Sequence, residues 1–130
     1  MTKEKLMQYR SIKTEIKQLQ EKIQELEERK TSIKSQIITD MPTGGESLDL
    51  LTIITIIEET QEKLRNKEIE LLKVMNEIEE IIDSLENSED RCILRARYIE
   101  CKKWEEICVE LNYSWRHMHR LHSKILDKIA

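Results

Sequence analysis

Seven side chains that could bind a ligand stand close together near the end of the sequence. They carry an indole, two guanidinium groups, two imidazoles, a hydroxyl and an ammonium group, at Trp115, Arg116, His117, His119, Arg120, Ser123 and Lys124. Around them an apolar stripe recurs at steps of three and four residues, at Met118, Leu121, Ile125 and Ile129. The stripe predicts a helix that buries one face and exposes these seven groups.

The chemistry of this exposed face matches duplex DNA. A guanidinium group binds guanine O6 and N7 together, and an ammonium group holds a phosphate. We therefore expect Arg116 and Arg120 to contact bases and Lys124 to contact the backbone. The alternative is an ordinary solvated helix face. Trp115 has two interpretations, packing against neighbouring helices or contact with a thymine methyl group or a sugar.

The histidines do not predict a metal site. His117 and His119 point about 200° apart on a helix, so only His119 and His122 could share an ion. No cysteine or carboxylate completes that pair at a suitable spacing, and the sequence has no glycine-rich phosphate loop. No serine or cysteine nucleophile is placed with an evident base. We expect neither a cofactor nor an enzymatic activity.

The helix that carries the seven groups has a short partner directly before it. A helix of about eight residues is expected over Trp104–Leu111, with its inward side chains at Trp104, Ile107, Cys108 and Leu111. Asn112 tolerates the left-handed conformation that ends a helix, and Ser114 caps the next one. Together they form a helix-turn-helix, in which Ser114–Lys128 is the recognition helix.

A further short helix completes the predicted C-terminal domain, residues 88–130. It is expected over Glu89–Glu100, with Ile93, Leu94 and Ile99 inward. Ser88 is its expected N-cap, and acidic residues in the first turn suit the positive end of the helix dipole. The domain carries nine Lys/Arg and seven Asp/Glu, so it is weakly basic although the whole chain has a net charge of −4.

Residues 1–87 are expected to form a long antiparallel helical hairpin, a coiled coil, with a loop near 39–46. Apolar residues recur at steps of three and four in both helices. In the first they are Leu6, Tyr9, Ile12, Ile16, Leu19, Ile23, Leu26, Ile33 and Ile37, and in the second Leu50, Ile54, Ile57, Leu64, Leu71, Met75, Ile78, Ile82 and Leu85. Residues 48–87 are strongly acidic, which favours pairing with the more basic first helix. The predicted fold class is all-α.

The start of the second hairpin helix has two notable features. Thr43 and Glu46 have capping-box spacing, which predicts a helix start near Glu46 or Ser47. Residues 50–57 are then apolar around an arc too wide for one partner helix. Two interpretations stay open, a β-branched run that seals the hairpin tip or a second contact surface for self-association or a partner protein.

Composition narrows the class of protein further. The chain is 37% charged and 4% aromatic, as is typical of long helices. No stretch approaches the roughly 20 apolar residues of a membrane span, and the charged start argues against a signal peptide. The three cysteines are odd in number and have no CxxC spacing, which indicates free thiols in a reducing cytoplasm.

Two motifs resemble a phage helix-turn-helix family. One runs over residues 98–107 and continues through 112–114, 116–118 and 120–122; the other, residues 40–45, is similar to that family's Asp-Met-Pro-x-Gly-Gly loop. The family is related to the ArpU and RinA late transcriptional regulators and is similar to region four of bacterial sigma factors. The resemblance implies a cytoplasmic protein of a phage or prophage, in a Gram-positive host cell, that acts on transcription.

Three residues depart from the pattern of that family. Cys101 replaces its usual turn glycine, Lys103 replaces a Ser/Thr helix cap, and Cys108 replaces its usual alanine. The first two are expected to loosen the start of the second helix of the domain. The similarity to region four also implies contact with host RNA polymerase.

Three functions are compatible with the sequence. The leading hypothesis is a non-enzymatic transcriptional regulator, with the hairpin for oligomerisation or polymerase contact. The first alternative is a DNA-packaging recognition subunit similar to a small terminase, which also joins a helix-turn-helix to coiled-coil oligomerisation. The second is a protein-interaction module whose helix-turn-helix no longer binds DNA. The weak positive charge keeps the second open, because Glu105, Glu106 and Glu110 must face away from phosphates.

Overall fold

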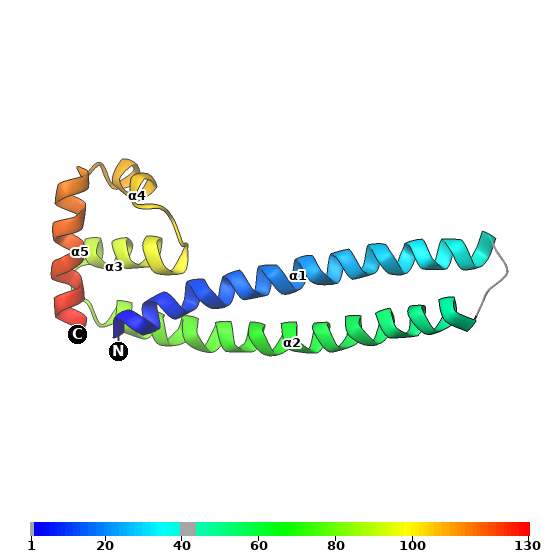
Figure 1. The fold of residues 1–130 in the computed structure, drawn as a ribbon. Helices are drawn as coiled ribbons and strands as arrows, with labels where there is room; N and C mark the ends of the chain where they lie inside the picture. Colours follow the sequence, from blue (N-terminus) through cyan, green and yellow to red (C-terminus); the bar gives the residue numbers. More distant parts are fainter. Residues whose placement is uncertain (1, 40–43) are drawn as a thin grey trace. The chain divides into compact units, whose positions relative to one another are not determined.

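The computed structural model describes residues 2–39 and 44–130, without the side chains of 36–48. These residues form the helices α1 (Thr2–Thr39), α2 (Gly44–Asp83), α3 (Ser88–Leu94), α4 (Trp104–Leu111) and α5 (Trp115–Ile129), and the π-helix η1 (Arg95–Ile99) (Figure 1). No strand occurs among them, so the all-α prediction is confirmed. None of the described helices is both long enough and apolar enough to cross a membrane.

The chain divides into two compact units. One comprises Met1–Lys13 and Glu70–Ala130, and the other comprises Thr14–Ile69. These divisions fall within α1 and α2, because the first turns of α1 and the last turns of α2 belong with the short helices. The domain boundary expected at 87/88 follows the end of α2 and stays a prediction.

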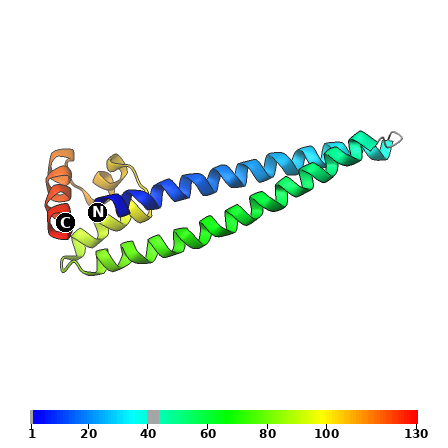
Figure 2. The same cartoon turned by 60° about the horizontal axis from the view of Figure 1, so that its bottom comes forward.

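In the first unit the start of α1 pairs with the end of α2 in antiparallel orientation (Figures 1 and 2). Lys5 forms an ion pair with Glu77, and Tyr9 Oη donates a weak hydrogen bond to Met75 Sδ at 3.9 Å. The apolar side chains that this pairing buries are Leu6, Tyr9, Ile12, Val74, Ile78, Ile82 and Leu85. The predicted stripes therefore form the core here, and Val74 joins them from outside the predicted pattern.

The second unit contains the remaining parts of α1 and α2, which are also antiparallel. Lys67 Nζ lies 2.9 Å from a carboxylate oxygen of Glu15. Ile16 and Ile57 are buried, while most other stripe residues are only half-buried, as in a two-helix seam. Thr60 is 1% exposed and satisfies its hydroxyl by donating to the Ile56 carbonyl at 2.7 Å.

The tip of the hairpin lies partly outside the described residues. The expected loop near 39–46 includes residues 40–43, which are outside the described residues. The expected capping box of Thr43 and Glu46 depends on side chains that are also outside them. The helix α2 begins at Gly44, two residues before the expected start. Within the apolar run 50–57, Ile57 is buried whereas Leu51 is 61% exposed. The run therefore contributes to the seam and also leaves apolar surface uncovered.

The first short helix differs from its prediction in two ways. Its N-cap is Asn87 rather than Ser88: Asn87 is extended and its side chain accepts from the Glu89 N–H at 2.9 Å. The helix also changes type at Arg95, and the Glu100 N–H bonds to the Arg95 carbonyl, five residues back. This wider turn rotates the following side chains, so Tyr98 is buried and Ile99, expected inward, is only half-buried.

The segment between η1 and α4 contains a residue with unusual backbone geometry. Cys101 has φ 57°, in the left-handed region that favours glycine. This is the position at which the resemblance expects a turn glycine. Lys103, the N-cap of α4, provides no side-chain cap. Both departures therefore leave a local cost at the start of the helix-turn-helix.

Replacing Cys101 by glycine should raise the free energy of unfolding by about 1 kcal/mol, because the clash of Cβ with the backbone disappears. Urea denaturation at one fixed protein concentration measures the change. Cys101→Ala keeps Cβ and should give no gain. An equal gain in both variants would show that the backbone conformation is not the source of the cost.

Candidate nucleic-acid interface

The turn between α4 and α5 is defined by hydrogen bonds at both of its ends. Asn112 is left-handed, at φ 59° and ψ 45°, and its N–H donates to the Val109 carbonyl. The Tyr113 N–H donates to the Cys108 carbonyl at 3.0 Å, which completes a Schellman motif. Ser114 Oγ accepts from the His117 N–H at 3.2 Å and so caps α5. The expected roles of Asn112 and Ser114 are confirmed.

The two helices of this motif are positioned by a small apolar core. Five side chains are at most 1% exposed: Ile93, Leu94, Ile107, Met118 and Ile125. Each such side chain contributes about 1.5–3 kcal/mol to folding. Leu121 and Ile129, expected to be inward, are half-buried. The helix α5 packs against both α3 and α4, so its opposite face is left to solvent (Figure 1).

An ion pair also holds the end of α5 against the start of α3. Lys128 Nζ lies 2.8 Å from Asp90 Oδ2, and the Asp90 side chain is only 7% exposed. Tyr113 lies in the turn, and the proximity of its hydroxyl to the Glu89 carboxylate at the start of α3 raises the pKa of that hydroxyl. The orientation of α5 is thus constrained near both of its ends.

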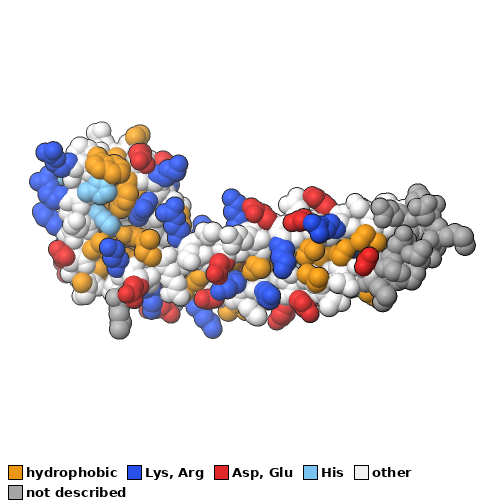
Figure 3. All heavy atoms as spheres, in the orientation of Figure 1, with side chains coloured by type: hydrophobic (Ala, Val, Ile, Leu, Met, Phe, Trp, Pro, Cys, Tyr) orange, Lys and Arg blue, Asp and Glu red, His pale blue; other side chains and the backbone are white. Residues whose placement is uncertain are grey.

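The outer face of α5 carries cations that form no ion pair with a carboxylate of the described residues. Arg116, Arg120 and Lys124 are exposed at steps of four residues, and Ser123 is exposed beside them. Figure 3 shows Lys and Arg side chains gathered along the outer edge of this helix. Within residues 88–130, all of which are described, the other cation without a partner is Lys103 at the start of α4.

The remaining cations of this segment are used internally. Lys102 contacts Glu100 and Glu110, and Arg95 pairs with Glu79 at 3.0 Å. Arg91 donates to two backbone carbonyls, and Arg97 donates to the Lys102 carbonyl while its guanidinium lies 4.8 Å from the centre of the Trp104 ring. The charge available to an external ligand is therefore concentrated on α5 and Lys103.

The two histidines expected on the exposed face are half-buried, and each contacts a neighbouring ring. The ring of His117 packs edge-on against Tyr113, with centroids 4.9 Å apart. The ring of His119 lies between Trp104, at 5.4 Å, and Trp115, at 4.2 Å. Its Nε2 is buried and has no hydrogen-bond partner among the described residues. Trp115 itself is 52% exposed, so only one part of its indole is covered.

His122, outside the predicted set, has a strongly shifted pKa that follows from its surroundings. Its Nε2 is hydrogen-bonded to Tyr98 Oη at 2.6 Å, and its ring meets Trp104 edge-on at 4.6 Å. Burial, followed by the nearby charges of His119, Arg97 and Lys3, lowers its pKa to about 4. The i, i+3 spacing of His119 and His122 showed that they share a face, but the aromatic partners come from other helices.

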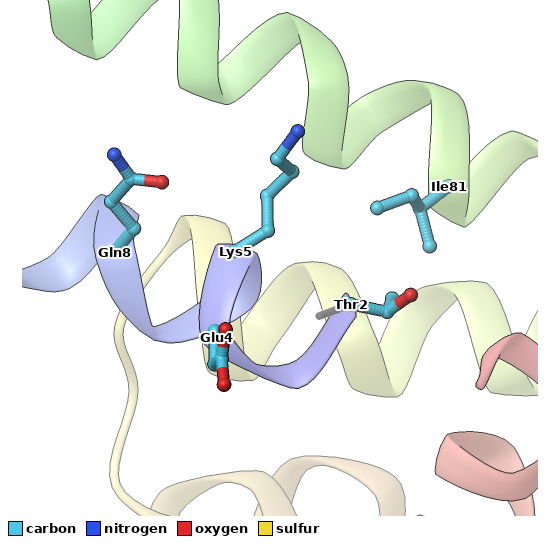
Figure 4. Close-up of a pocket in the computed structure, with 5 residues that line it drawn as sticks. All are labelled: Thr2, Glu4, Lys5, Gln8 and Ile81. Atoms are coloured by element: carbon cyan, nitrogen blue, oxygen red, sulfur yellow. The ribbon is translucent and has the colours of Figure 1, made fainter.

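Other ligand sites are not evident in the described part of the chain. No group of three His, Cys, Asp or Glu side chains there could hold a metal ion. An open hollow of about 500 Å³ lies between α1 and α2, lined by Thr2, Glu4, Lys5, Gln8 and Ile81 (Figure 4). Its ammonium group is already paired with Glu77. The hollow therefore offers few converging groups for a charged ligand.

This geometry defines a class, that of all-helical proteins with a helix-turn-helix whose second helix has a basic outer face. A family model matches residues 30–129, from within α1 to the last residue of α5. The chain belongs to that family, which is described as "Protein of unknown function (DUF1492)". No curated protein and no solved structure matches the chain.

The pKa of His122 has a consequence for stability. Because it is lowered from 6.5 to about 4, the unfolded chain binds more protons between these values, and stability falls as the pH drops through this range. His122→Gln keeps a hydrogen-bonding group and should remove about 1–2 kcal/mol of this loss, less than the full shift because the half-buried ring is screened.

Denaturation curves at pH 7, 6, 5 and 4 measure the effect. His117→Gln is the matched control, since it makes the same substitution on the same helix at a ring that packs on Tyr113. The assignment fails if wild type and His122→Gln lose stability in parallel over this range.

Proposed function

We propose that this chain is a DNA-binding transcriptional regulator of a phage or prophage, which contacts promoter DNA through α4, the turn and α5. It acts without enzymatic activity in the cytoplasm of the bacterial host. The observation that carries the proposal is the row of unpaired cations on α5, on the helix that a helix-turn-helix places in the major groove. The resemblance to the ArpU and RinA regulators adds to this support.

The distribution of charge favours α5 over α4 as the helix that faces DNA. Glu105 and Glu106 are exposed in the first turn of α4 and would repel phosphates. On α5, the guanidinium groups of Arg116 and Arg120 are separated by about 40° around the helix axis, so both can enter one groove. Lys124, one helical turn after Arg120, then serves as a phosphate contact.

The hairpin supplies the affinity that a weakly basic domain lacks. Phosphate neutralisation dominates affinity for DNA, and four free cations neutralise few phosphates. A second copy of the domain would double the number of cations that contact DNA. Contact with host RNA polymerase would hold the domain close to promoter DNA. Leu51 and Ile69, both in the second unit, are 61% and 53% exposed and suit self-association through α2.

Replacing Arg120 with alanine should weaken binding to its cognate promoter duplex by about 1–3 kcal/mol, because a bidentate contact to guanine is lost. Binding of the full chain to phage late-promoter DNA across a salt series measures this. Arg65→Ala is the matched control, since Arg65 is an exposed arginine of the second unit, paired with Glu62. Unchanged affinity for Arg120→Ala, or an equal loss in the control, would contradict the proposal.

Leu51→Lys should reduce the molar mass measured by light scattering, because a charge in an apolar contact is costly to desolvate. Ile69→Lys should act in the same direction. Asn66→Lys adds the same charge at an exposed polar position of α2 and should leave the mass unchanged. Equal masses for all three variants and wild type would exclude this surface as the oligomer contact.

A further inference from the structure

The largest exposed ring of the helix-turn-helix stands at the first residue of α5. Trp115 is 52% exposed and directly follows the cap residue Ser114. Recognition helices present their first residues to base edges, so Trp115 stands next to the guanidinium of Arg116 at the end that enters the groove. Figure 3 shows hydrophobic and histidine side chains together beside the cations of α5. The exposed part of this indole is apolar surface, which a bound ligand can cover with an apolar group of its own.

The orientation of Trp115 is already constrained in the free protein. Its ring meets His119 edge-on, with centroids 4.2 Å apart. His119 in turn contacts Trp104, which contacts His122, and His122 is hydrogen-bonded to Tyr98. These ring contacts form a continuous series from the buried Tyr98 to Trp115 at the surface. A side chain held in this way loses little rotamer freedom when it binds, which favours a specific contact.

The role of His119 follows from the same arrangement. Its Nε2 is buried and has no hydrogen-bond partner in the part of the chain that the structure describes, so that nitrogen is not directed at an external ligand. The ring instead fills the space between Trp104 and Trp115. His119 is therefore a positioning residue that acts through Trp115, and an aromatic ring without nitrogen should serve equally well.

We propose that Trp115, braced by His119, selects thymine by packing against its C5-methyl group, beside the base contacts of Arg116 and Arg120. This inference rests on the proposed function and specifies how that site selects its DNA. The argument is chemical: the thymine methyl is the apolar group that a base pair presents in the major groove, whereas the other groups there are donors and acceptors. An indole among guanidinium groups therefore adds selection for thymine to selection for guanine.

The test begins with a pool of random-sequence duplexes, selected with the full-length wild-type chain. The selected duplex is then resynthesised with deoxyuridine in place of each thymine in turn, which removes one methyl group. At one position wild type should bind about fourfold more weakly, the value for burying one such group. Trp115→Ala should bind the thymine and deoxyuridine duplexes equally.

Two further variants separate contact from positioning. His119→Phe keeps the ring and should retain the fourfold discrimination, whereas His119→Ala should lose most of it while still binding DNA. Trp115→Phe should retain part of the discrimination. Circular dichroism establishes that each variant is folded before it is compared.

The outcomes distinguish this inference from the proposed function. If wild type selects no duplex and shows no salt-sensitive binding, the proposed function fails and the inference fails with it. If wild type selects a duplex but no deoxyuridine substitution matters, the inference alone fails. A contact between Trp115 and a sugar would give a different result. Wild type would then bind the thymine and deoxyuridine duplexes equally well, and Trp115→Ala would bind both more weakly by the same factor. That result would also overturn the inference. Loss of discrimination in His119→Phe overturns the positioning role.

Discussion

The left-handed turn at Asn112 is the constraint on which the buried core and the exposed cations of the C-terminal helices both depend. It ends α4, and two residues later Ser114 starts α5, so the crossing of the two helices is set within three residues. Because of that crossing, Ile107 of α4 and Met118 of α5 are both fully buried, and the opposite face of α5 stays in solvent. A change in this turn would move the exposed cations and the indole of Trp115 together, since α5 carries all of them.

Ion pairing within the first unit decides which charges remain for a ligand. Lys102, Lys128 and Arg95 have carboxylate partners, whereas the cations on the outer face of α5 have none within the described part of the chain. A net charge of −4 for the whole chain is therefore a poor guide to its surface. The acidic groups are largely on the hairpin and on α4, and dissolved salt screens exposed charges that are separated by more than about 10 Å.

Local sequence signals were reliable for the helices and their ends. The bounds of α4 agree with the prediction, Asn112 and Ser114 have their expected roles, and the apolar stripes form the hairpin seam. The exceptions are also local. Asn87 and Ser88 can both cap a helix, and only the backbone decides between them. The π-turn after Leu94 has no sequence signature that a spacing rule detects, so Ile99, expected inward, is only half-buried.

The residues of the candidate site also fall into two groups, those placed by local spacing and those placed by tertiary contacts. The sequence by itself determined that α5 is amphipathic and that Arg116, Arg120, Ser123 and Lys124 share its outer face, because residues three and four apart are neighbours on any helix. Only the tertiary structure decided that His119 faces two tryptophans and that Lys128 forms an ion pair with Asp90, 38 residues away. Those contacts depend on how helices dock, and docking is a property of no single segment.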